Sequence, residues 1–496
     1  MYGLNHHILP RNIDPIAIRA ALDNQINTMC KNNNISLSFD NKINIREATD
    51  RFIHEAENVC KSRRNRFLHR TLRNLANRSE LKVCKMDKGI GIILLDTSDY
   101  FKKLDQIIDD RSRFRKLDYN INVEKLAEHK NAPWIKKESS VATYCRKLKP
   151  FIDEKTYWRI HPQGSQPGKM YGMAKNHKEN CPMRPVLSAI NTPEYYLAKW
   201  LEGQLKPYLR DKYSIASSTI FVEEIRKIKP AQTDICVSFD IRSLYTNVPL
   251  QEVINDITDT VYSNSAASGF FAKTKVITRT VFKNILKICS ESVFLYKENV
   301  YQQCDGVAMG SPLAPILANW FVAGIEHKIM DDPKHDPYKP VVYKRYVDDI
   351  FAVFRSTTDR DKFFGVLNGT HPNLKFTMET TSPDLPFLDV SVSIKDSAYN
   401  TQVFRKPTNT GVLMNFNSMA PRKWKKALTK CLLNRALRLS SSFDFFTSEV
   451  ETIKSNLKSN GFPDHFVNSI CDDFIAQHAI NANSFGVSNR WYALSL

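Results

Sequence analysis

Two apolar segments in the second half of the chain are separated by a pair of acidic residues. Residues 341–345 and 350–354 are rich in β-branched and aromatic side chains, and Asp348 and Asp349 lie between them. Segments of this kind form strands that pair across a short connection. The pattern therefore predicts a β-hairpin with both acids at or next to its turn.

A further strand is predicted upstream of this hairpin. Residues 235–239 form an apolar run of strand length that ends directly on Asp240. A run this short and this apolar is typical of a buried strand. Asp240 would then stand at the mouth of that strand, although an acid in this place could also cap a following helix.

Between the two predicted strand regions, no residue from Gly306 to Ile325 is charged. A membrane-spanning helix has a similar length, but the prolines, glycines and Asn319 of this segment would leave backbone groups unsatisfied in lipid. We therefore expect a Gly/Pro loop over 306–312 and a buried helix over about 313–325. Small residues there would let the backbone approach a flat ligand such as a base pair. A tight entry turn into a core helix would have the same composition.

The chain is strongly basic, with 71 Lys and Arg against 52 Asp and Glu and a net charge of +19. This balance favours polyanionic partners such as nucleic acid, although a basic ribosomal or chromatin protein would share it. Part of the charge follows helical spacing over residues 61–78. In that helix we expect four apolar side chains to face inward: Phe67, Leu68, Leu72 and Leu75.

A second basic helix is predicted from Arg422 onward. Its apolar residues at helical spacing, expected to face inward, are Trp424, Leu428, Cys431 and Leu432, and the basic residues expected to face outward are Lys430, Arg435 and Arg438. Such a helix could track a nucleic-acid backbone. It could equally be a solvated face, or a basic amphipathic helix for a membrane surface or a partner protein.

The cysteines and the first residues bear on the compartment. The ten cysteines are scattered and none forms a Cys-x-x-Cys pair, so no zinc ligand set stands out. Their uneven spacing favours reduced intracellular thiols over a disulfide framework. The start of the chain, Met1 to His7, lacks the apolar core of a secretion signal. We expect an intracellular protein.

Asp240, Asp348 and Asp349 are residues whose chemistry suits a hard cation. Two carboxylates about 4 Å apart repel each other by roughly 4 kcal/mol at an effective dielectric near 20, which a nearby cation would relieve. Mg²⁺ takes one or two protein carboxylates together with waters and phosphate oxygens. Two such ions about 3.5–4 Å apart can activate an attacking oxygen and stabilise a leaving one. A solvated Asp-Asp turn is the simpler alternative.

The order of these segments resembles that of a reverse transcriptase palm. SFDIRSLYTNVPL (238–250), GVAMGSPLAPILANWF (306–321) and RYVDDIFAVF (345–354) resemble motifs A, B and C of that family. Other segments resemble the Penelope-like element reverse transcriptases in particular, namely KMDKGIGIILLD (85–96), YGMAKNHK (171–178), MRPVLSAINTPEYYLAKWL (183–201), LPFLDVSV (385–392), VFRKPTNT (403–410) and the NGFPDHFV region near Asn460. The resemblance covers residues 85–473.

The resemblance implies roles for the acidic residues and their neighbours. Asp240, Asp348 and Asp349 match the catalytic, metal-binding triad, and the Ile241 carbonyl would also face a metal. Tyr245 matches the steric gate that excludes a ribose 2′-hydroxyl, unless it is an ordinary buried aromatic residue.

It also implies contacts to substrate and nucleic acid. Arg184 matches the fingers arginine that contacts the incoming triphosphate, Lys175 is expected as the second cation, and Lys178 is a weaker candidate. Three residues of the loop are expected to line the substrate: Met309, Gly310 and Ser311. The residues expected to contact the nucleic-acid backbone are Arg405, Lys406, Arg422, Lys423, Lys426 and Lys430.

The fold implied is α+β: a right-hand polymerase with fingers, a palm built on an antiparallel sheet and a helical thumb, preceded by a largely helical N-terminal region. The expected ranges are 1–133 for the basic N-terminal region, 134–230 for the fingers, 231–399 for the palm, 400–479 for the thumb and 480–496 for a tail. Within the palm, residues 251–301 are expected to form a helical insertion.

The function implied is that of an RNA-directed DNA polymerase of a Penelope-like retroelement. It would transfer nucleotides from deoxynucleoside triphosphates to a primer 3′-hydroxyl on an RNA template, using two Mg²⁺ ions, with Mn²⁺ as a possible substitute. The expected partners are the RNA template, the DNA primer and their hybrid, with no membrane, and residence in the nucleus is expected.

Two alternatives remain. One is a domesticated, non-catalytic nucleic-acid-binding protein on a polymerase fold. The other is a fragment of a larger element polyprotein that lacks an endonuclease, because no GIY-YIG motif pair, which many relatives carry downstream, is found in this sequence.

Overall fold

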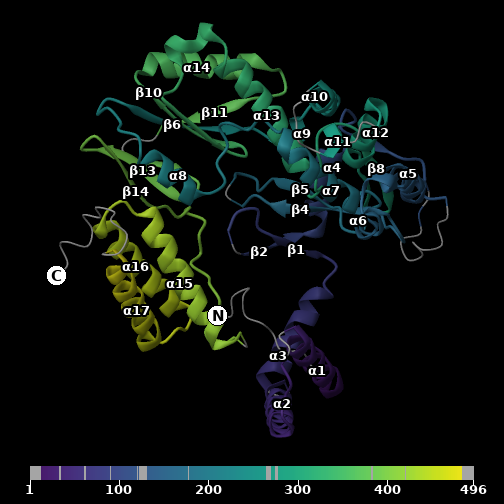
Figure 1. Cartoon of the computed structure of the whole chain (residues 1–496), viewed down its shortest axis with the longest axis vertical. Helices are drawn as coiled ribbons and strands as arrows, with labels where there is room; N and C mark the ends of the chain where they lie inside the picture. Colours follow the sequence, from purple (N-terminus) through teal and green to yellow (C-terminus); the bar gives the residue numbers. More distant parts are fainter. Residues whose placement is uncertain are drawn as a thin grey trace.

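The computed structural model (Figure 1) describes residues 13–32, 35–60, 63–89, 91–119, 121, 131–176, 178–263, 270–273, 277–380, 384–418 and 420–482. They form helices and mainly antiparallel sheets in separate groups, so the predicted α+β class is confirmed. In Figure 1 a sheet with α14 lies at the upper left, a larger mixed group at the right and a helical group at the lower left.

The sheet at the upper left has the strand order β11-β6-β10-β9, with all neighbours antiparallel. Its strands are β6 (Ile235–Ile241), β9 (Val342–Tyr346), β10 (Asp349–Phe354) and β11 (Phe376–Glu379). Successive β10 side chains enter different cores, since Ile350 and Ala352 pack with α13 and α14, whereas Phe351 and Val353 pack with α8. The β10 strand is thus buried on both faces, which is why its sequence after Asp349 is continuously apolar. We call this sheet the palm sheet.

The helices around the palm sheet are α8 (Ser218–Ile225), α13 (Ala314–Met330) and α14 (Thr357–Thr370), with the short 3₁₀ helix η4 (Pro333–Tyr338) after α13. The helix predicted over 313–325 is therefore real but runs five residues further, to Met330. Within the described part of the chain, no helix has both the length and the apolar character needed to cross a bilayer.

A five-stranded sheet in the order β3-β8-β7-β4-β5 lies at the right of Figure 1, and we call it the fingers sheet and its surroundings the fingers. Its strands are β3 (Phe114–Lys116), β4 (Gly168–Ala174), β5 (Met183–Ser188), β7 (Val293–Tyr296) and β8 (Asn299–Gln303). The helices of this region are α4 (Thr97–Ile108), α5 (Pro133–Leu148), α6 (Glu154–Ile160) and α7 (Tyr195–Leu205), with the 3₁₀ helices η2 (Lys149–Phe151) and η3 (Lys206–Tyr208).

The connection from motif A to motif B is only partly helical, which corrects the expectation for residues 251–301. It contains α9 (Leu244–Asn247), α10 (Leu250–Ser263), α11 (Phe270–Lys273) and α12 (Arg279–Ser290), and then the β7–β8 hairpin. All four residues of β7 are buried. So short a run shows no alternation, and besides its neighbour β8 it pairs with β4, which is distant in the sequence, so the local pattern did not identify the strand.

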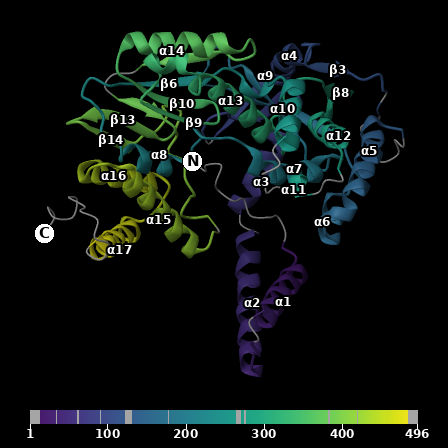
Figure 2. The ribbon, with the colours of Figure 1, turned by 45° about the horizontal axis from the view of Figure 1, so that its top comes forward.

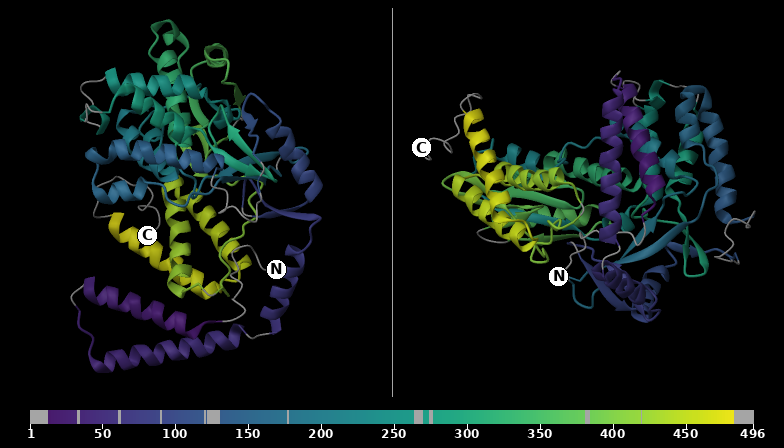
Figure 3. Two further views of the ribbon diagram at one scale, coloured as in Figure 1. Left: turned by 90° about the vertical axis from the view of Figure 1, so that its right-hand side faces the viewer. Right: turned by 90° about the horizontal axis from the view of Figure 1, so that it is seen from below.

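The N-terminal region consists of α1 (Pro15–Asn32), α2 (Phe39–Cys60) and α3 (Arg63–Ala76), followed by the β1 (Leu81–Lys85)–β2 (Ile92–Asp96) hairpin. Figures 2 and 3 show α1 and α2 side by side, projecting away from the rest of the molecule. The inward face predicted for α3 is wrong at two positions, since Phe67 is 65% and Leu72 is 45% exposed. The helix leads from the projecting pair to the β1–β2 hairpin, so little of the chain covers it.

A further sheet, β12-β13-β14, lies between the palm sheet and a group of helices that we call the thumb helices. Its strands are β12 (Leu385–Phe387), β13 (Val390–Lys395) and β14 (Ala398–Val403), and the thumb helices are α15 (Arg422–Leu439), α16 (Phe443–Ser459) and α17 (Asp464–Ala482). Most of the tail expected over 480–496 lies outside the described residues.

The inward face predicted for α15 is confirmed at Leu428 and Leu432, which are half-buried and pack against the helical core, but it is wrong at the other two positions. Trp424 is 56% exposed and Cys431 is exposed, whereas the buried residues are Lys425, Thr429, Leu433, Ala436 and Leu439. Lys425 can be buried because its Nζ donates to the Ser418 carbonyl at 2.9 Å and lies 5.0 Å from the centre of the Phe416 ring. The sequence pattern did not place Lys425 among the inward-facing residues, and the predicted face was therefore rotated.

Candidate active site

The three predicted acids meet at one end of the palm sheet. In the β6–β10 register Asp240 is the direct partner of Asp349, and in the β9–β10 register Asp349 is the partner of Tyr346. Directly opposite residues in an antiparallel pair have Cα atoms about 4.5–5.5 Å apart. Asp348 lies in the two-residue turn, and its carbonyl accepts the Ile241 N–H at 3.0 Å. Asp240 lies inside its strand, and Ser243 precedes α9 instead, so the helix-cap alternative is wrong.

The electrostatics of this cluster show negative charge without full compensation. Burial, followed by the charges of Asp348 and Asp240, raises the pKa of Asp349 to about 6. Burial, followed by the charge of Asp348, also raises the pKa of Asp240. Lys88, Lys178 and Lys406 act in the opposite direction on these pKa values. The carboxylates are therefore held close together at an energetic cost that a bound cation would remove.

Magnesium fits this donor set in its chemistry. Among the described residues, no group of three or more His, Cys, Asp or Glu side chains already surrounds a single point as a metal cage. Mg²⁺ does not need such a cage, because it keeps several waters and usually takes one or two carboxylates plus phosphate oxygens. Burial and the neighbouring acids raise the pKa of Asp349, and a cation bound at this place would lower it by offsetting their negative charge.

Arg184 and Lys175 come from the β4–β5 hairpin of the fingers. Arg184 lies on β5 opposite Met173, and its Nη1 is 3.0 Å from Oδ1 of Asp87, whose side chain is 2% exposed. Nε of Arg184 and Oδ2 of Asp87 are buried without a hydrogen-bond partner. The pKa of Lys175 is lowered by burial first and then by Arg184 and Lys178. Lys175, Arg184 and Lys178 thus lie close enough to repel one another, and Asp87 offsets only part of their charge. A bound polyphosphate would reduce this repulsion.

Lys88 is a candidate that the sequence did not single out. Asp87 N donates to the Ala174 carbonyl at 2.9 Å, which fixes the β1–β2 loop to the fingers. Gly89, at φ +93°, lies so close to the thumb-side loop that an added Cβ would be 3.1 Å from the Thr408 carbonyl oxygen. Lys88 between them is exposed. The Asp-Lys-Gly sequence lies in a segment noted only for its resemblance to a family, and the fold brings it between the fingers and the loop that carries Thr408.

Tyr245 lies on α9, beside the acids. It is also next to the Gly/Pro loop over residues 306–312, which we call the glycine loop. Its carbonyl accepts Val307 N at 2.8 Å. Burial of the phenol, followed by the charge of Asp348, raises the pKa of Tyr245. The ring is half-buried, and it packs against the core without being enclosed by it. Both a packing role and a role at the edge of a substrate pocket are compatible with this position.

The glycine loop is wedged between α9 and β5. Gly306 has φ +70°, and an added Cβ would be 2.8 Å from the Thr246 carbonyl oxygen. Gly310 has φ +117°, and its Cβ would be 2.0 Å from the Leu187 carbonyl oxygen. Leu187 N donates to the Met309 carbonyl at 2.8 Å, while Ser311 is buried. This loop is where the fingers sheet joins the palm, so close backbone packing alone accounts for both glycines.

The predicted nucleic-acid contacts fall into two groups. Arg405 is held by Glu449, with Nη1 2.6 Å from Oε2 and Nη2 on Oε1, so its guanidinium is already engaged. Lys406 lies at the acid cluster, where it lines a hollow with Tyr346 and Asp349. On α15, Arg422, Lys423 and Lys426 are exposed, and Lys430 is half-buried.

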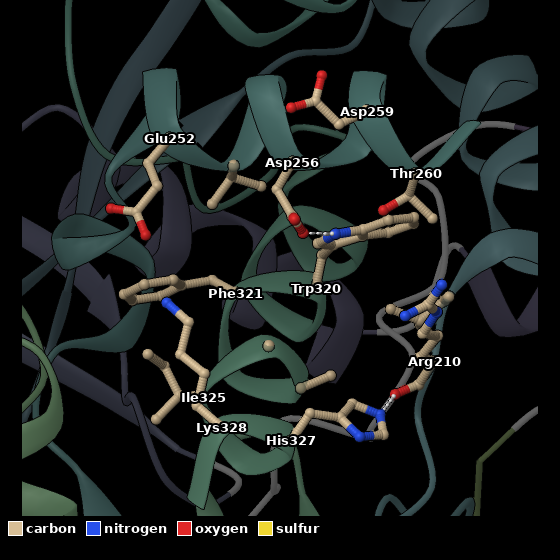
Figure 4. Close-up of a pocket in the computed structure, with 14 residues that line it drawn as sticks. Arg210, Glu252, Asp256, Asp259, Thr260, Trp320, Phe321, Ile325, His327 and Lys328 are labelled. Carbon is tan, nitrogen blue, oxygen red and sulfur yellow. Dashed lines mark hydrogen bonds between the residues drawn. The ribbon is translucent and has the colours of Figure 1, made fainter. Parts of the chain in front are cut away.

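A separate hollow of about 380 Å³ lies between α10 and α13, as Figure 4 shows. Asp256 on α10 accepts Trp320 Nε1 at 2.6 Å, and His327 Nε2 hydrogen-bonds the Arg210 carbonyl at 2.9 Å. None of the predicted site residues lines this hollow. The hollow is therefore distinct from the acid cluster, although α13 both lines the hollow and packs against the palm sheet.

Comparisons with known proteins agree with this geometry. Residues 177–379 match the model of the reverse transcriptase (RNA-dependent DNA polymerase) family, and residues 412–471 match that of the animal helix-turn-helix domain. No curated protein matches the chain. The first family generally uses divalent metal ions.

Two solved structures are similar in fold. Telomerase from Candida albicans, in complex with a fragment of telomeric RNA, has a TM-score of 0.55 and 12% identity over 87% of this chain and 72% of that chain. Apo telomerase from Candida tropicalis has a TM-score of 0.47 and 11% identity over 89% and 72%. At these identities only the fold is informative, and the first structure carries that conclusion. The chain is therefore an RNA-directed DNA polymerase, a nucleotidyltransferase with a right-hand polymerase fold whose reverse transcriptase domain spans residues 177–379.

Proposed function

We propose that this polymerase is the reverse transcriptase of a Penelope-like retroelement, and that it extends a DNA primer on an RNA template with deoxynucleoside triphosphates. The observation that carries the catalytic part is the register that sets Asp240 opposite Asp349, with Asp348 in the adjoining turn. The Penelope-like assignment is supported by the segments of residues 85–473 that resemble that group. Nuclear residence is part of the same proposal.

The proposed reaction joins the primer 3′-hydroxyl to the α-phosphate of the nucleotide and releases pyrophosphate. Magnesium ions, when bound by Asp240, Asp348 and Asp349 with help from the Ile241 carbonyl, would neutralise charge on the reacting oxygens. The strands hold these carboxylates in place before substrate arrives, so little reorganisation is needed at the moment of reaction.

The triphosphate would bind to Arg184, Lys175 and Lys88. Arg184 is already oriented by Asp87, and its side chain is 37% exposed, so the accessible part of the guanidinium can bond phosphate oxygens. Burial, followed by the neighbouring cations, lowers the pKa of Lys175, and an incoming polyanion would raise that pKa again. Lys88 would approach from the β1–β2 loop, opposite the fingers hairpin, so that the three cations surround the phosphates.

Sugar and base would be selected by neighbouring elements. The Tyr245 ring would exclude a 2′-hydroxyl by its bulk, and Met309, Gly310 and Ser311 would lie against the new base pair. The exposed basic residues of α15 would grip the backbone of the hybrid. Arg405 would act indirectly, because its bond to Glu449 orders the loop that carries Lys406.

An Asp348→Asn variant tests the proposal. Primer extension on an RNA template in Mg²⁺ should fall by several orders of magnitude, while binding of the primed template stays within about twofold, because the amide cannot replace an anionic ligand. Asp361→Asn, at an exposed site on α14, is the matched control and should extend normally. Normal extension by Asp348→Asn would remove this residue from catalysis. Binding without extension by the native protein would favour the non-catalytic alternative.

A further inference from the structure

The base of the acidic hairpin contains a fully buried arginine. Arg345, next to Tyr346 at the end of β9, has a side chain with 0% exposure. Its backbone is fixed as well, since its backbone N–H donates to the Tyr213 carbonyl at 2.9 Å and its carbonyl accepts the Ile215 N–H at 2.8 Å. A buried cation is costly unless it is fully paired, so its partners indicate what it holds together.

All five N–H groups of this guanidinium have an acceptor. Nε and Nη2 form a fork with Glu326 at 2.7 and 3.0 Å, and Nη2 also donates to Asp211 Oδ1 at 3.0 Å. Nη1 donates to Asn319 Oδ1 at 2.6 Å and to the Val347 carbonyl at 3.3 Å. No capacity remains for substrate or nucleic acid, so any role of Arg345 in the reaction must act through these partners.

The partners come from three other parts of the fold. Asn319 and Glu326 lie seven residues apart on α13 and therefore on one face of that helix. Asp211 precedes the palm sheet, and its segment is tied to α13 a second time by the His327–Arg210 bond visible in Figure 4. Through Val347 the same guanidinium reaches the turn itself. Arg345 thus links the helix that follows the glycine loop to the turn that carries Asp348.

That turn is strained. Val347 has φ +57°, a left-handed conformation that is unusual for a β-branched residue and costs of order 1–3 kcal/mol. Such a conformation persists only when its surroundings impose it. Arg345 bonds the carbonyl of this residue, and Ile241 N bonds the carbonyl of the next, Asp348. The two contacts together fix the peptide between Val347 and Asp348.

We propose that Arg345 is a positioning residue, which locks the Val347–Asp348 turn to α13 and so sets the spacing between the carboxylates of the hairpin and that of Asp240. The inference rests on the proposed function, because it gives the spacing a purpose. An ion pair with a purely structural role would stabilise the fold without affecting how the carboxylates meet a metal.

The chain offers a matched control at the opposite end of the same two strands. Arg355, just after β10, pairs at 2.8 Å with Asp234, just before β6, and the Asp234 side chain is 2% exposed. Arg355→Met therefore also leaves a buried carboxylate without its arginine. It does so far from the acids and at an arginine that is itself 55% exposed, so it shows the effect of an unpaired buried carboxylate without the proposed positioning effect.

The experiment compares Arg345→Met, Arg345→Lys and Arg355→Met in three measurements: the thermal midpoint, Mn²⁺ binding by electron paramagnetic resonance in the absence of substrate, and the Mg²⁺ dependence of primer extension. Arg345→Met should weaken Mn²⁺ binding and raise the half-saturating Mg²⁺ concentration by about 10-fold or more, as loss of a residue that orients metal ligands does. Arg345→Lys, which keeps the charge but not the planar fork, should fall between Arg345→Met and the native chain.

Arg355→Met should lower the thermal midpoint but leave both metal measurements within about twofold of the native values. Equal metal affinities for the Arg345 and Arg355 variants would overturn the inference. If Arg345→Met does not fold, Arg345→Lys decides the question, and an unchanged Mn²⁺ affinity in that variant would overturn it. A native chain that binds Mn²⁺ but never extends a primer would instead contradict the proposed function.

Discussion

Gly310→Ala is expected to destabilise the protein by disrupting the packing of the glycine loop against β5. The backbone at Gly310 has φ +117°, and an added Cβ would lie 2.0 Å from the Leu187 carbonyl oxygen. The obstacle is backbone, which cannot rotate away like a side chain, so the loop or β5 must move by more than about 1 Å to restore van der Waals contact. This movement would also break the bond from Leu187 N to the Met309 carbonyl.

The cost follows from three effects. Overpacking contributes about 1–3 kcal/mol, a non-glycine residue at this φ about 1–2 kcal/mol, and the lost hydrogen bond about 1 kcal/mol. We expect a loss of about 4 kcal/mol, equivalent to a fall in the thermal midpoint of roughly 10 °C for a cooperative unit the size of the reverse transcriptase domain.

The assay is thermal unfolding followed by circular dichroism, with Gly324→Ala as the control. Gly324 lies inside α13, and an added Cβ there would meet no heavy atom within 4 Å. Alanine at this helical position should raise stability by about 0.5–1 kcal/mol. A Gly310→Ala variant as stable as the Gly324→Ala variant would refute the assigned packing of the glycine loop.

Three further predictions concern the candidate site. Tyr245→Ala should reduce discrimination against ribonucleotides by roughly 100-fold, whereas Tyr245→Phe should preserve it. Steady-state incorporation of ribonucleotides and deoxyribonucleotides measures this discrimination. Unchanged discrimination in Tyr245→Ala would leave the ring a packing role only. Lys88→Ala should raise KM for the nucleotide about 10-fold or more, with Lys85→Ala on the same hairpin as control, and equal KM values would remove Lys88 from the triphosphate site. Asp349→Asn should raise the thermal midpoint of EDTA-treated protein at pH 7.5. The pKa of Asp349 in the folded native chain, about 6, lies above the ordinary 3.8, so the cost of ionising it is present above about pH 6 and absent below about pH 4. An unchanged thermal midpoint of the variant at pH 7.5 would contradict the crowding of the acids.

The elements around the acids were predictable because their sequences are locally unambiguous. The β10 strand is apolar on both faces after Asp349, since α13 and α14 cover one face and α8 the other, and β6 begins with an apolar run. Two such strands with acids at their ends leave few arrangements for Asp240 and Asp349. The hairpin and its acidic turn could be read directly, whereas the β7–β8 hairpin, whose partner strand is remote, could not.

Features that depend on contacts distant in sequence were missed. The buried face of α15 includes Lys425, because a carbonyl and an aromatic ring receive its charge. Arg345 looked like one more basic residue of a basic chain, yet it is fully buried among acceptors from three other segments. Lys88 acquires its position only when the β1–β2 loop meets both fingers and thumb. Composition cannot show these, because each depends on which segments the fold brings together.

The shared metal site is tested most directly by crystals of the protein soaked in Mn²⁺ and measured at the manganese absorption edge. The account predicts an anomalous peak within about 2.5 Å of carboxylate oxygens from Asp240 and from at least one of Asp348 and Asp349, and no such peak in crystals of the Asp348→Asn, Asp349→Asn double variant. A peak bound elsewhere, or carboxylates that stay empty at saturating Mn²⁺, would contradict it.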